Sequence, residues 1–290
     1  MHEVISGLAL AEGMTVLDAT LGGAGHAEAI SEQIGSRGTL IGLDQDPDAL
    51  VRAEERLSRF ETKRILREAN FRDLEAVLAR EGVHSLDRAL FDLGWSQNQL
   101  ELSGRGFSFQ RSEPLLMTFG KGNEGLTAYE IANTWSEEDL SRIIREYGEE
   151  RFSGRIARGI VEERSLGKIE TTFDLVRAIE RNIPGFYKSG RIHPATRTFQ
   201  AFRIAVNDEL GVIETALAAA FQMLSVGGRI AVISFHSLED RIVKNFFRTK
   251  KMSGEARLYS KKPVEASDDE RTENPRSRSA KLRIVIKNPQ

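Results

Sequence analysis

Short apolar runs alternate with longer amphipathic segments through the first third of the chain. Alternating or continuous apolar runs predict strands, whereas apolar residues spaced three or four apart predict helices. The predicted strands cover 15–18, 39–44, 63–66 and 88–93, and the predicted helices cover 25–34, 47–57 and 71–79. Strands that alternate with helices are joined by right-handed crossovers and form a parallel sheet. We therefore expect an α/β fold.

The middle of the chain has a different pattern, because residues 126–183 show helical periodicity and no convincing strand. Several segments here begin with capping residues, namely Thr127 with Glu130, Ser136 with Asp139, and Thr172 ahead of an apolar run. This region predicts a helical lobe inserted into the α/β fold.

The strand pattern returns in the last third of the chain. The elements predicted there are a long amphipathic helix over 198–224, a strand over 229–235, a mobile polar loop over 253–274 and a last strand over 281–286. We therefore expect one discontinuous domain made of residues 1–100 and 196–290, with residues 101–195 as the inserted lobe.

Composition narrows the class of protein. With 290 residues and 40% hydrophobic content, the chain is long enough to bury a sizeable core in one large domain or two ordinary ones. The sequence has no cysteine, which excludes disulfides, thiolate metal sites and a cysteine nucleophile. Its histidines lack metal-ligand spacing, so we expect no metal in catalysis. No apolar run approaches the ~20 residues of a membrane span and no signal peptide is evident, so we expect a cytoplasmic protein.

A glycine-rich turn follows the first predicted strand and opens the next helix. Gly22, Gly23 and Gly25 free the backbone for turn conformations, and a helix N-terminus offers unpaired N–H groups to a ligand. The dinucleotide pattern G-x-G-x-x-G fails at Glu28, which disfavours a nicotinamide cofactor. Asp18 ahead of the glycines suits a positively charged group instead, such as the amino-acid end of S-adenosylmethionine.

Residues at the carboxyl ends of the next strands suit the rest of such a ligand, because ligands of open α/β sheets bind at that edge. Asp44 lies about 20 residues after the first glycine, where a carboxylate accepts hydrogen bonds from ribose hydroxyls. An alternative role for Asp44 is a helix N-cap, but Asp46 next to Pro47 is the better cap. Phe71 suits either stacking on a purine or packing in the core.

The fourth predicted strand ends in Asp92-Leu93-Gly94-Trp95, which supplies an acceptor, a turn and a flat ring. Enzymes that methylate the exocyclic amine of cytosine or adenine often use Asp or Asn followed by two turn residues and an aromatic residue. The lone pair of such an amine is delocalised into the base, so the site must accept the amine hydrogens before the nitrogen attacks. We predict that Asp92 is catalytic and that Trp95 contacts the base, unless its ring packs in the core.

Two basic stretches predict contact with nucleic acid, although the net charge of the chain is only −2. Residues 186–203 interleave lysine and arginine with aromatic residues and contain no acid, as expected where phosphates and unpaired bases are bound. Residues 274–283 carry further cations without an acid. The alternative for both stretches is a solvated surface, over a phenylalanine core in the first of them.

His236 follows the restored strand at the edge where we expect catalysis. It suits a base or a phosphate ligand, or else a hydrogen-bonded histidine at a strand end. Ser237 with Asp240 three residues later fits a helix cap, which argues against a catalytic Asp240.

Several long motifs, in one order, resemble the bacterial ribosomal RNA small subunit methyltransferase H family, also called MraW. The matching motifs are residues 18–26, 105–109, 147–152, 193–200, 233–241 and 274–283. The resemblance implies a Rossmann-like class I S-adenosylmethionine-dependent methyltransferase sheet with an inserted helical lobe. The implied reaction is N4-methylation of a cytidine in the decoding region of 16S ribosomal RNA, with that RNA or the assembled small subunit as partner.

The resemblance and the preceding observations together give the predicted site residues. By motif matching, the cofactor contacts fall on Ala24, Gly25, His26, Asp44, Phe71, Asp92 and Gln99, to which the glycine turn adds Gly22 and Gly23. The predicted substrate contacts are Trp95, Arg105, His193, Arg197, His236, Arg276 and Arg278.

The chain departs from the family pattern at two places that bear on the substrate. Trp95 replaces a small aliphatic residue, and residues 96–98 replace a double serine and proline. Residues 115–120 lack two acids and an arginine of the family pattern. Two alternatives stay open: a methyltransferase of another RNA or DNA amino group, and a module that binds cofactor and RNA without turnover.

Overall fold

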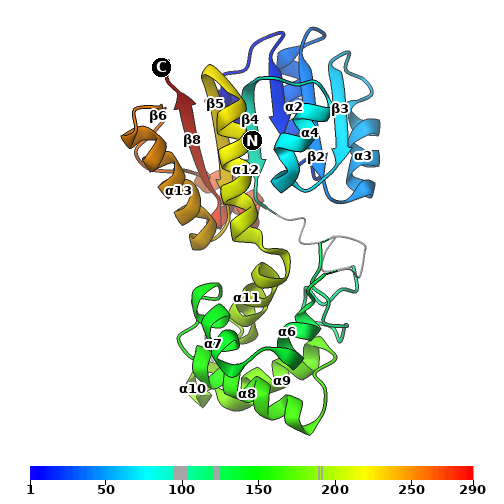
Figure 1. Cartoon of the computed structure of the whole chain (residues 1–290), viewed down its shortest axis with the longest axis vertical. Coiled ribbons are helices and arrows are strands. Elements are labelled where there is room, and N and C mark those ends of the chain that lie inside the picture. The colour runs from blue at the N-terminus through cyan, green and yellow to red at the C-terminus, as the bar shows by residue number, and fades with distance from the viewer. Residues whose placement is uncertain (95–102, 120–124, 189, 191, 290) are drawn as a thin grey trace. The chain divides into compact units, whose positions relative to one another are not determined.

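The computed structural model describes residues 1–94, 103–119, 125–188, 190 and 192–289. The chain forms two compact units, one made of Met1–Trp95 with Leu210–Gln290 and the other of Ser96–Glu209 (Figure 1). The limits of the second unit lie outside those expected for the lobe, 101–195, on both sides. Within the described ranges, no helix combines the length and the apolar character that a membrane span requires.

The first unit is built on an eight-stranded sheet. Seven strands follow the order β3-β2-β1-β4-β5-β8-β6, and the eighth, β7, pairs with β8. The strands are β1 Thr15–Asp18, β2 Thr39–Asp44, β3 Lys63–Glu68, β4 Leu86–Asp92, β5 Leu224–Ser234, β6 Ala256–Leu258, β7 Val264–Glu265 and β8 Lys281–Lys287. The first five strands are parallel to one another, which confirms the predicted parallel sheet, and β8 is antiparallel to β5. The strand order reverses between β1 and β4, and ligands of open α/β sheets bind at such a switch point.

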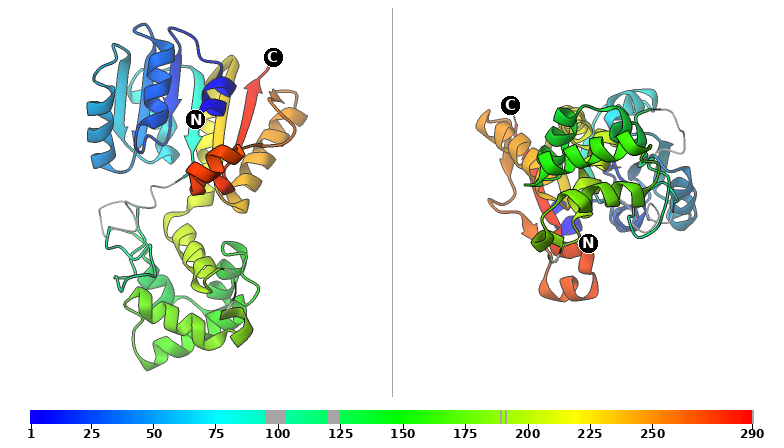
Figure 2. Two further views of the ribbon diagram at one scale, coloured as in Figure 1. Left: turned by 180° about the vertical axis from the view of Figure 1, so that it is seen from behind. Right: turned by 90° about the horizontal axis from the view of Figure 1, so that it is seen from below.

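Helices cover both faces of this sheet (Figures 1 and 2). The helical segments around it are α1 His2–Leu8, α2 Gly25–Ile34, α3 Pro47–Leu57, η1 Phe71–Asp73, α4 Leu74–Arg80, α12 Glu209–Met223, α13 Ser237–Met252, α14 Asp268–Glu273 and η2 Pro275–Ser279. Successive strand residues point to opposite faces, so Val16 packs with α1, α2 and α3 while Leu17 packs with α4, α12 and α13. The apolar runs of the sequence are continuous because both faces of the sheet are buried.

The stretch 253–274 is ordered, so the prediction of a mobile loop there is wrong. Both β6 and β7 lie within it, and each pairs antiparallel with β8. The side chain of Ala256 is buried in the core between the sheet and α13. These strands are too short to show a hydrophobic period, and pairing with a distant strand orders them.

Two helices, α11 Ala195–Asn207 and α12, replace the single helix predicted over 198–224. Asp208 between them adopts φ 49° and ψ 40°, a left-handed conformation that ends α11. The side-chain amide of Asn207 donates to the carbonyl of Met117 at 2.8 Å. A bond to so distant a residue leaves no trace in the local hydrophobic period.

The second unit is helical, as the sequence predicts, and has its own core. Its helices are α6 Ala128–Thr134, α7 Glu137–Glu146, α8 Ser153–Leu166, α9 Thr172–Asn182, α10 Gly185–Lys188 and α11. The predicted caps of α6 at Thr127 and of α7 at Ser136 are confirmed. The cap of α9 is Thr171 rather than Thr172, whose buried hydroxyl instead donates to the carbonyl of Arg111.

Candidate active site

The glycine turn between β1 and α2 is held by side chains from two other elements. The N–H of Gly22, at φ 49°, donates to Oδ2 of Asp44 at 2.8 Å, and Nη1 of Arg56 donates to the carbonyl of Gly23 at 2.9 Å. Ala24 is left-handed at φ 57° and precedes α2, which begins at Gly25. A Cβ at Gly23 would meet no atom within 4 Å, so the turn is open at that position.

Asp44 ends β2 and uses both carboxylate oxygens to organise this edge. Oδ2 accepts from Gly22, and Oδ1 accepts from the N–H of Asp46 at 2.8 Å. Burial is the main cause that raises the pKa of Asp44 above its usual value. A carboxylate oxygen can accept two hydrogen bonds, so each oxygen of Asp44 retains acceptor capacity for a ribose hydroxyl. Asp46 caps α3 with Pro47 in its first turn, which confirms the predicted cap.

Asp18 ends β1 beneath the glycine turn and is almost fully buried. Its Oδ1 accepts the N–H of Thr20 at 3.2 Å, but its buried Oδ2 has no hydrogen-bond partner among the described residues. Burial raises the pKa of Asp18 to about 7, and the negative charges of Asp92 and Asp44 raise it further. Oδ2 of Asp18 thus lacks a donor or a cation among the described residues, and an ammonium group would supply one.

Asp92 ends β4 on the other side of the switch point. Its N–H donates to the hydroxyl of Thr20 at 2.7 Å, and its Oδ1 accepts the N–H of Gly94 at 3.2 Å. Its Oδ2 lies 3.6 Å from Nδ1 of His26, and about a quarter of the Asp92 side chain remains accessible. Burial raises the pKa of Asp92 to about 6 and lowers the pKa of His26 to about 4. At neutral pH a carboxylate therefore lies beside a neutral imidazole.

The turn after Asp92 is tightly packed against the end of β5. A Cβ at Gly94 would lie 2.6 Å from the ring of Phe235, so no larger residue fits there without movement of the ring. Nothing in the sequence pattern revealed this contact, or the hydroxyl of Thr20 that holds the backbone of Asp92. Both join segments that are remote in the chain.

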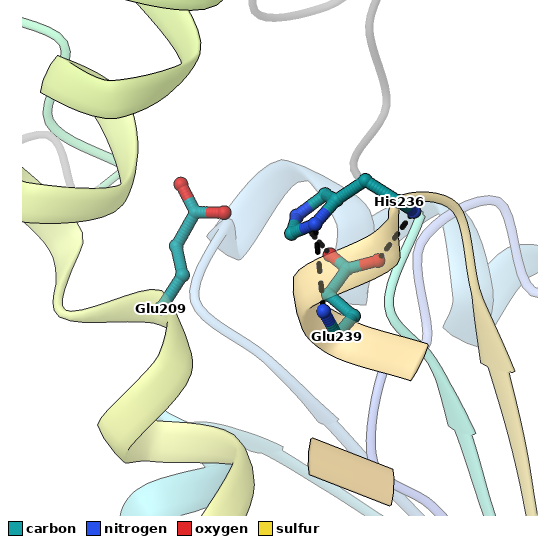
Figure 3. A group of neighbouring side chains, drawn as sticks. All are labelled: Glu209, His236 and Glu239. Atoms are coloured by element: carbon teal, nitrogen blue, oxygen red, sulfur yellow. Dashed lines mark hydrogen bonds and ion pairs between the residues drawn. The ribbon is translucent and has the colours of Figure 1, made fainter. Parts of the chain in front are cut away.

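His236 is the N-cap of α13. The N–H of Glu239 donates to Nδ1 of His236 at 3.4 Å, and Oε2 of Glu239 accepts the N–H groups of Phe235 and His236. Figure 3 shows the imidazole over the buried carboxylate of Glu239, with Nε2 of the ring 3.0 Å from Oε1. The predicted cap formed by Ser237 with Asp240 is therefore wrong, because His236 and Glu239 form the capping box one residue earlier. Histidine is not among the usual N-cap residues, so the sequence pattern favoured Ser237.

Asp240 pairs instead with the C-terminal basic stretch. Its carboxylate accepts from Nε and Nη2 of Arg283 at 2.6 and 3.2 Å, and Nζ of Lys281 lies 3.5 Å away. These two cations are structural, which contradicts their assignment to RNA. Arg278 is exposed, and its Nε donates to the carbonyl of Arg271 at 3.4 Å. The side chain of Arg276 lies outside what the structure describes.

Phe71 is half-buried in η1, with its ring edge-on to Phe91 at 6.1 Å between centroids and 87° between planes. One side of the ring thus packs in the core, and part of it remains accessible at the ligand edge. Trp95 and Gln99 lie outside the described residues, so their predicted roles have no structural counterpart here.

The candidate substrate residues of the second unit each have partners within that unit. Nη1 of Arg105 donates to the carbonyls of Thr118 and Phe119, both at 2.7 Å. The ring of His193 stacks on Phe109 at 4.6 Å, and Nδ1 of His193 accepts the N–H of Ala195. These contacts stabilise the loops that carry Arg105 and His193.

The aromatic residues of 186–203 divide between core and surface. Phe199 and Phe202 are buried in the second core, so stacking on bases is wrong for these two rings and the alternative of a phenylalanine core is confirmed. Arg197 donates from Nη1 to the carbonyl of Glu149 at 2.8 Å. Phe186, by contrast, is 70% exposed.

This chain is similar to known proteins over nearly its whole length. The family model described as the MraW methylase family matches residues 1–288. A protein from Geotalea daltonii named "Ribosomal RNA small subunit methyltransferase H" is 47% identical over 98% of this chain and 96% of its own length. Proteins of the same name from Sulfurihydrogenibium sp. and Deinococcus deserti are 49% and 48% identical, over 97% and 98% of this chain and 95% and 90% of their own lengths.

Proposed function

Because this chain belongs to the MraW methylase family, we propose that it methylates N4 of a cytidine in the decoding region of 16S ribosomal RNA. The protein is an S-adenosylmethionine-dependent methyltransferase with a Rossmann-like sheet. The shared name of its relatives supports small-subunit ribosomal RNA as the substrate. The acceptor geometry at Asp92 supports an amino group as the methylated atom.

The cofactor fits the residues around the glycine turn. Oδ2 of Asp18 is buried and unpartnered within the described chain, which suits the ammonium group of the methionine end. Asp44 retains acceptor capacity for the ribose, and the half-buried ring of Phe71 remains partly accessible at the same edge of the sheet. The cofactor supplies an electrophilic methyl group on a sulfonium, and the acids that end β1, β2 and β4 favour that positive charge.

The single observation that carries the proposed chemistry is the hydrogen bonding of the two carboxylate oxygens of Asp92. Its Oδ1 is fixed by the N–H of Gly94, whereas its Oδ2 is 3.6 Å from His26, too far for a hydrogen bond. Among the described residues, Oδ2 therefore has no hydrogen-bond donor, and its lone pairs can accept from an incoming amine. A cytidine amine that donates one hydrogen to Oδ2 gains electron density at nitrogen, and this density is what attack on the methyl group requires.

Asp92 also provides a route for the proton. After methyl transfer the nitrogen is strongly acidic, and its proton passes to Asp92 or to water without a high-pKa base. The target base must leave its stack to reach the carboxylate, as enzymes that act on bases require. In-line displacement then depends on holding the amine and the methyl group at near-attack distance.

The test is methyl transfer from labelled S-adenosylmethionine to small ribosomal subunits that lack the modification, followed by nucleoside mass spectrometry. We expect N4-methylcytidine with the wild-type chain and at least about 100-fold slower formation of it with Asp92→Ala. Cofactor binding to the variant, measured by calorimetry, controls for loss of the fold. A different methylated nucleoside, or cofactor binding without any product, would overturn the proposed reaction.

A further inference from the structure

A surface of the second unit combines one exposed and two half-buried aromatic rings with exposed guanidinium groups. We call it the arginine–aromatic patch, and it consists of Arg151, Phe152, Arg155, Phe186 and Tyr187. Phe152 is the N-cap of α8 and Arg155 lies in its first turn, whereas Phe186 and Tyr187 belong to the short helix α10. None of these residues contributes to the candidate active site described above.

The rings and the guanidinium group of Arg151 form one cluster. Phe152 lies edge-on to Tyr187 at 4.9 Å and to Phe186 at 6.3 Å between ring centroids. The guanidinium carbon of Arg151 is 4.7 Å from the centroid of Phe152, 5.1 Å from that of Tyr187 and 5.8 Å from that of Phe186. These distances lie within the range of cation–π attraction, so the cation is held over the rings.

The buried acid Glu150 binds two residues of the arginine–aromatic patch. The hydroxyl of Tyr187 donates to Oε2 of Glu150 at 2.5 Å, and Oε1 of Glu150 accepts the N–H of Phe152 at 2.8 Å. Glu150 is only 1% exposed, so its carboxylate is bound by these two donors and is shielded from water. The ring of Tyr187 and the backbone of Phe152 are consequently fixed before any ligand binds, which lowers the entropic cost of binding beside them.

The ring of Phe186 is the exposed part of this anchored cluster. Its 70% exposure contrasts with the burial of Phe199 and Phe202 in the same unit. A large apolar ring that faces water on a fixed base is suited to stack on another flat group.

The charge of the surface specifies the kind of ligand. Arg151, Arg155 and Lys188 are exposed, and none of them forms an ion pair with a described residue. Other arginines of this unit are paired, such as Arg142 with Asp139 and Arg177 with Glu163. Unpaired cations beside an exposed ring complement a polyanion that carries flat bases.

We propose that the arginine–aromatic patch binds a single-stranded segment of the RNA substrate. One unpaired base stacks on Phe186, and the flanking phosphates contact Arg151, Arg155 and Lys188. A duplex does not fit this recognition, because its bases are stacked on one another and are not free to cover the ring. The inference rests on the proposed function in one respect only, which is that RNA is the substrate.

The test measures binding of a labelled single-stranded RNA oligonucleotide from the decoding region to the full chain. Loss of one base–aromatic stack should raise the Kd of Phe186→Ala about 5- to 150-fold, and Phe186→Trp should bind nearly as the wild type does. Arg151→Gln should reduce the slope of log K against log salt by about 0.7, the value for one phosphate of a single strand.

Two matched variants control for effects of truncation alone. Phe173→Ala removes another exposed phenylalanine of the same unit, and Arg142→Gln removes an exposed arginine that is already paired. Both should leave the Kd for RNA unchanged. A duplex RNA competitor should displace the oligonucleotide weakly.

Methyl transfer by the same variants separates this inference from the proposed function. Unchanged RNA binding by Phe186→Ala, with N4-methylcytidine formed by the wild type, would refute the patch and leave the reaction standing. Weakened binding by that variant, with no N4-methylcytidine from the wild type, would support the patch and refute the reaction. Equal competition by duplex RNA, or equal loss of binding in Phe173→Ala, would also refute the patch.

Discussion

Nδ1 of His26 lies 3.6 Å from Oδ2 of Asp92, which brings the first turn of α2 beside the end of β4. The two side chains are largely shielded from water, with 18% and 25% of each exposed. Burial disfavours the charged form of both, so the pKa of His26 falls to about 4 and that of Asp92 rises to about 6. The pair therefore carries a single negative charge at neutral pH, and that charge lies on the acid.

Replacement of Asp92 by alanine should lower kcat by at least about 100-fold, because it removes the side-chain acceptor for the amine hydrogens. Initial rates at saturating cofactor and ribosomal subunits measure this effect. Thermal unfolding and the Kd for S-adenosylmethionine serve as controls and should change little. Turnover within a few-fold of the wild type would exclude the acceptor role.

The rate should fall below about pH 6 as Asp92 becomes protonated. An acid with its pKa raised to about 6 is ionised above that pH, so kcat/KM should be level near pH 7 to 8 and drop about tenfold per pH unit below the inflection. His26→Gln should keep the same inflection, since the pKa of His26 is about 4. A profile without an inflection between pH 5 and pH 7 would contradict this assignment.

Asp18 should make the free protein less stable as the pH rises. The pKa of Asp18 is raised to about 7 in the folded state from 3.8, so between these values the folded state binds more protons than the unfolded state. The free energy of unfolding therefore falls from about pH 4 to pH 7, by up to about 4 kcal/mol from this group.

Urea unfolding of wild type and Asp18→Asn at pH 5 and pH 8 measures this contribution. The variant should gain stability relative to the wild type between the two pH values. S-adenosylmethionine should stabilise the wild type more than the variant, because the variant lacks the anionic partner for the ammonium group. The same stability difference at both pH values would count against the buried acid.

Asp44 and Asp46 provide a matched pair for cofactor binding. Asp44→Ala should raise the Kd for S-adenosylmethionine roughly 10- to 100-fold, since it removes a charged acceptor and releases the N–H of Gly22. Asp46→Ala should cost about 1 kcal/mol of stability through the lost cap of α3 and leave the Kd unchanged. Calorimetry of both variants decides the matter, and equal Kd values would return Asp44 to a purely structural role.

Gly94→Ala should destabilise the first unit by about 1 to 3 kcal/mol, because the added Cβ would overlap the ring of Phe235. The double variant with Phe235→Leu should recover part of that loss, as expected for a pair in contact. Chemical unfolding of the single and double variants gives the coupling energy. Additive effects would show that the ring does not limit this position.

Local sequence patterns were sufficient for the elements that bear the site. The runs before Asp18 and Asp44 identified β1 and β2 because each strand is buried on both faces. Asp46 next to Pro47 identified the start of α3, since both residues act within one turn. In these cases the physical cause lies within a few residues of its effect.

The sequence failed where a residue depends on a distant partner. Asp240 looked like a capping residue, but the antiparallel pairing of β5 with β8 brings Arg283 and Lys281 to it. Phe199 and Phe202 looked like nucleic-acid contacts, because cations interleave with them, yet helical packing buries both rings. A basic stretch shows its charge in sequence, but not the acids that the fold brings to it.

The hydroxyl of Thr20 belongs to the glycine turn proposed to bind the cofactor, yet it accepts the N–H of Asp92 on a neighbouring strand. The position of the Asp92 carboxylate at the switch point is consequently set by the glycine turn as well as by β4. Affinity and turnover therefore do not have to change together when this turn is altered. A change at Thr20 can leave cofactor affinity intact and still slow methyl transfer, because it displaces the acceptor from the amine.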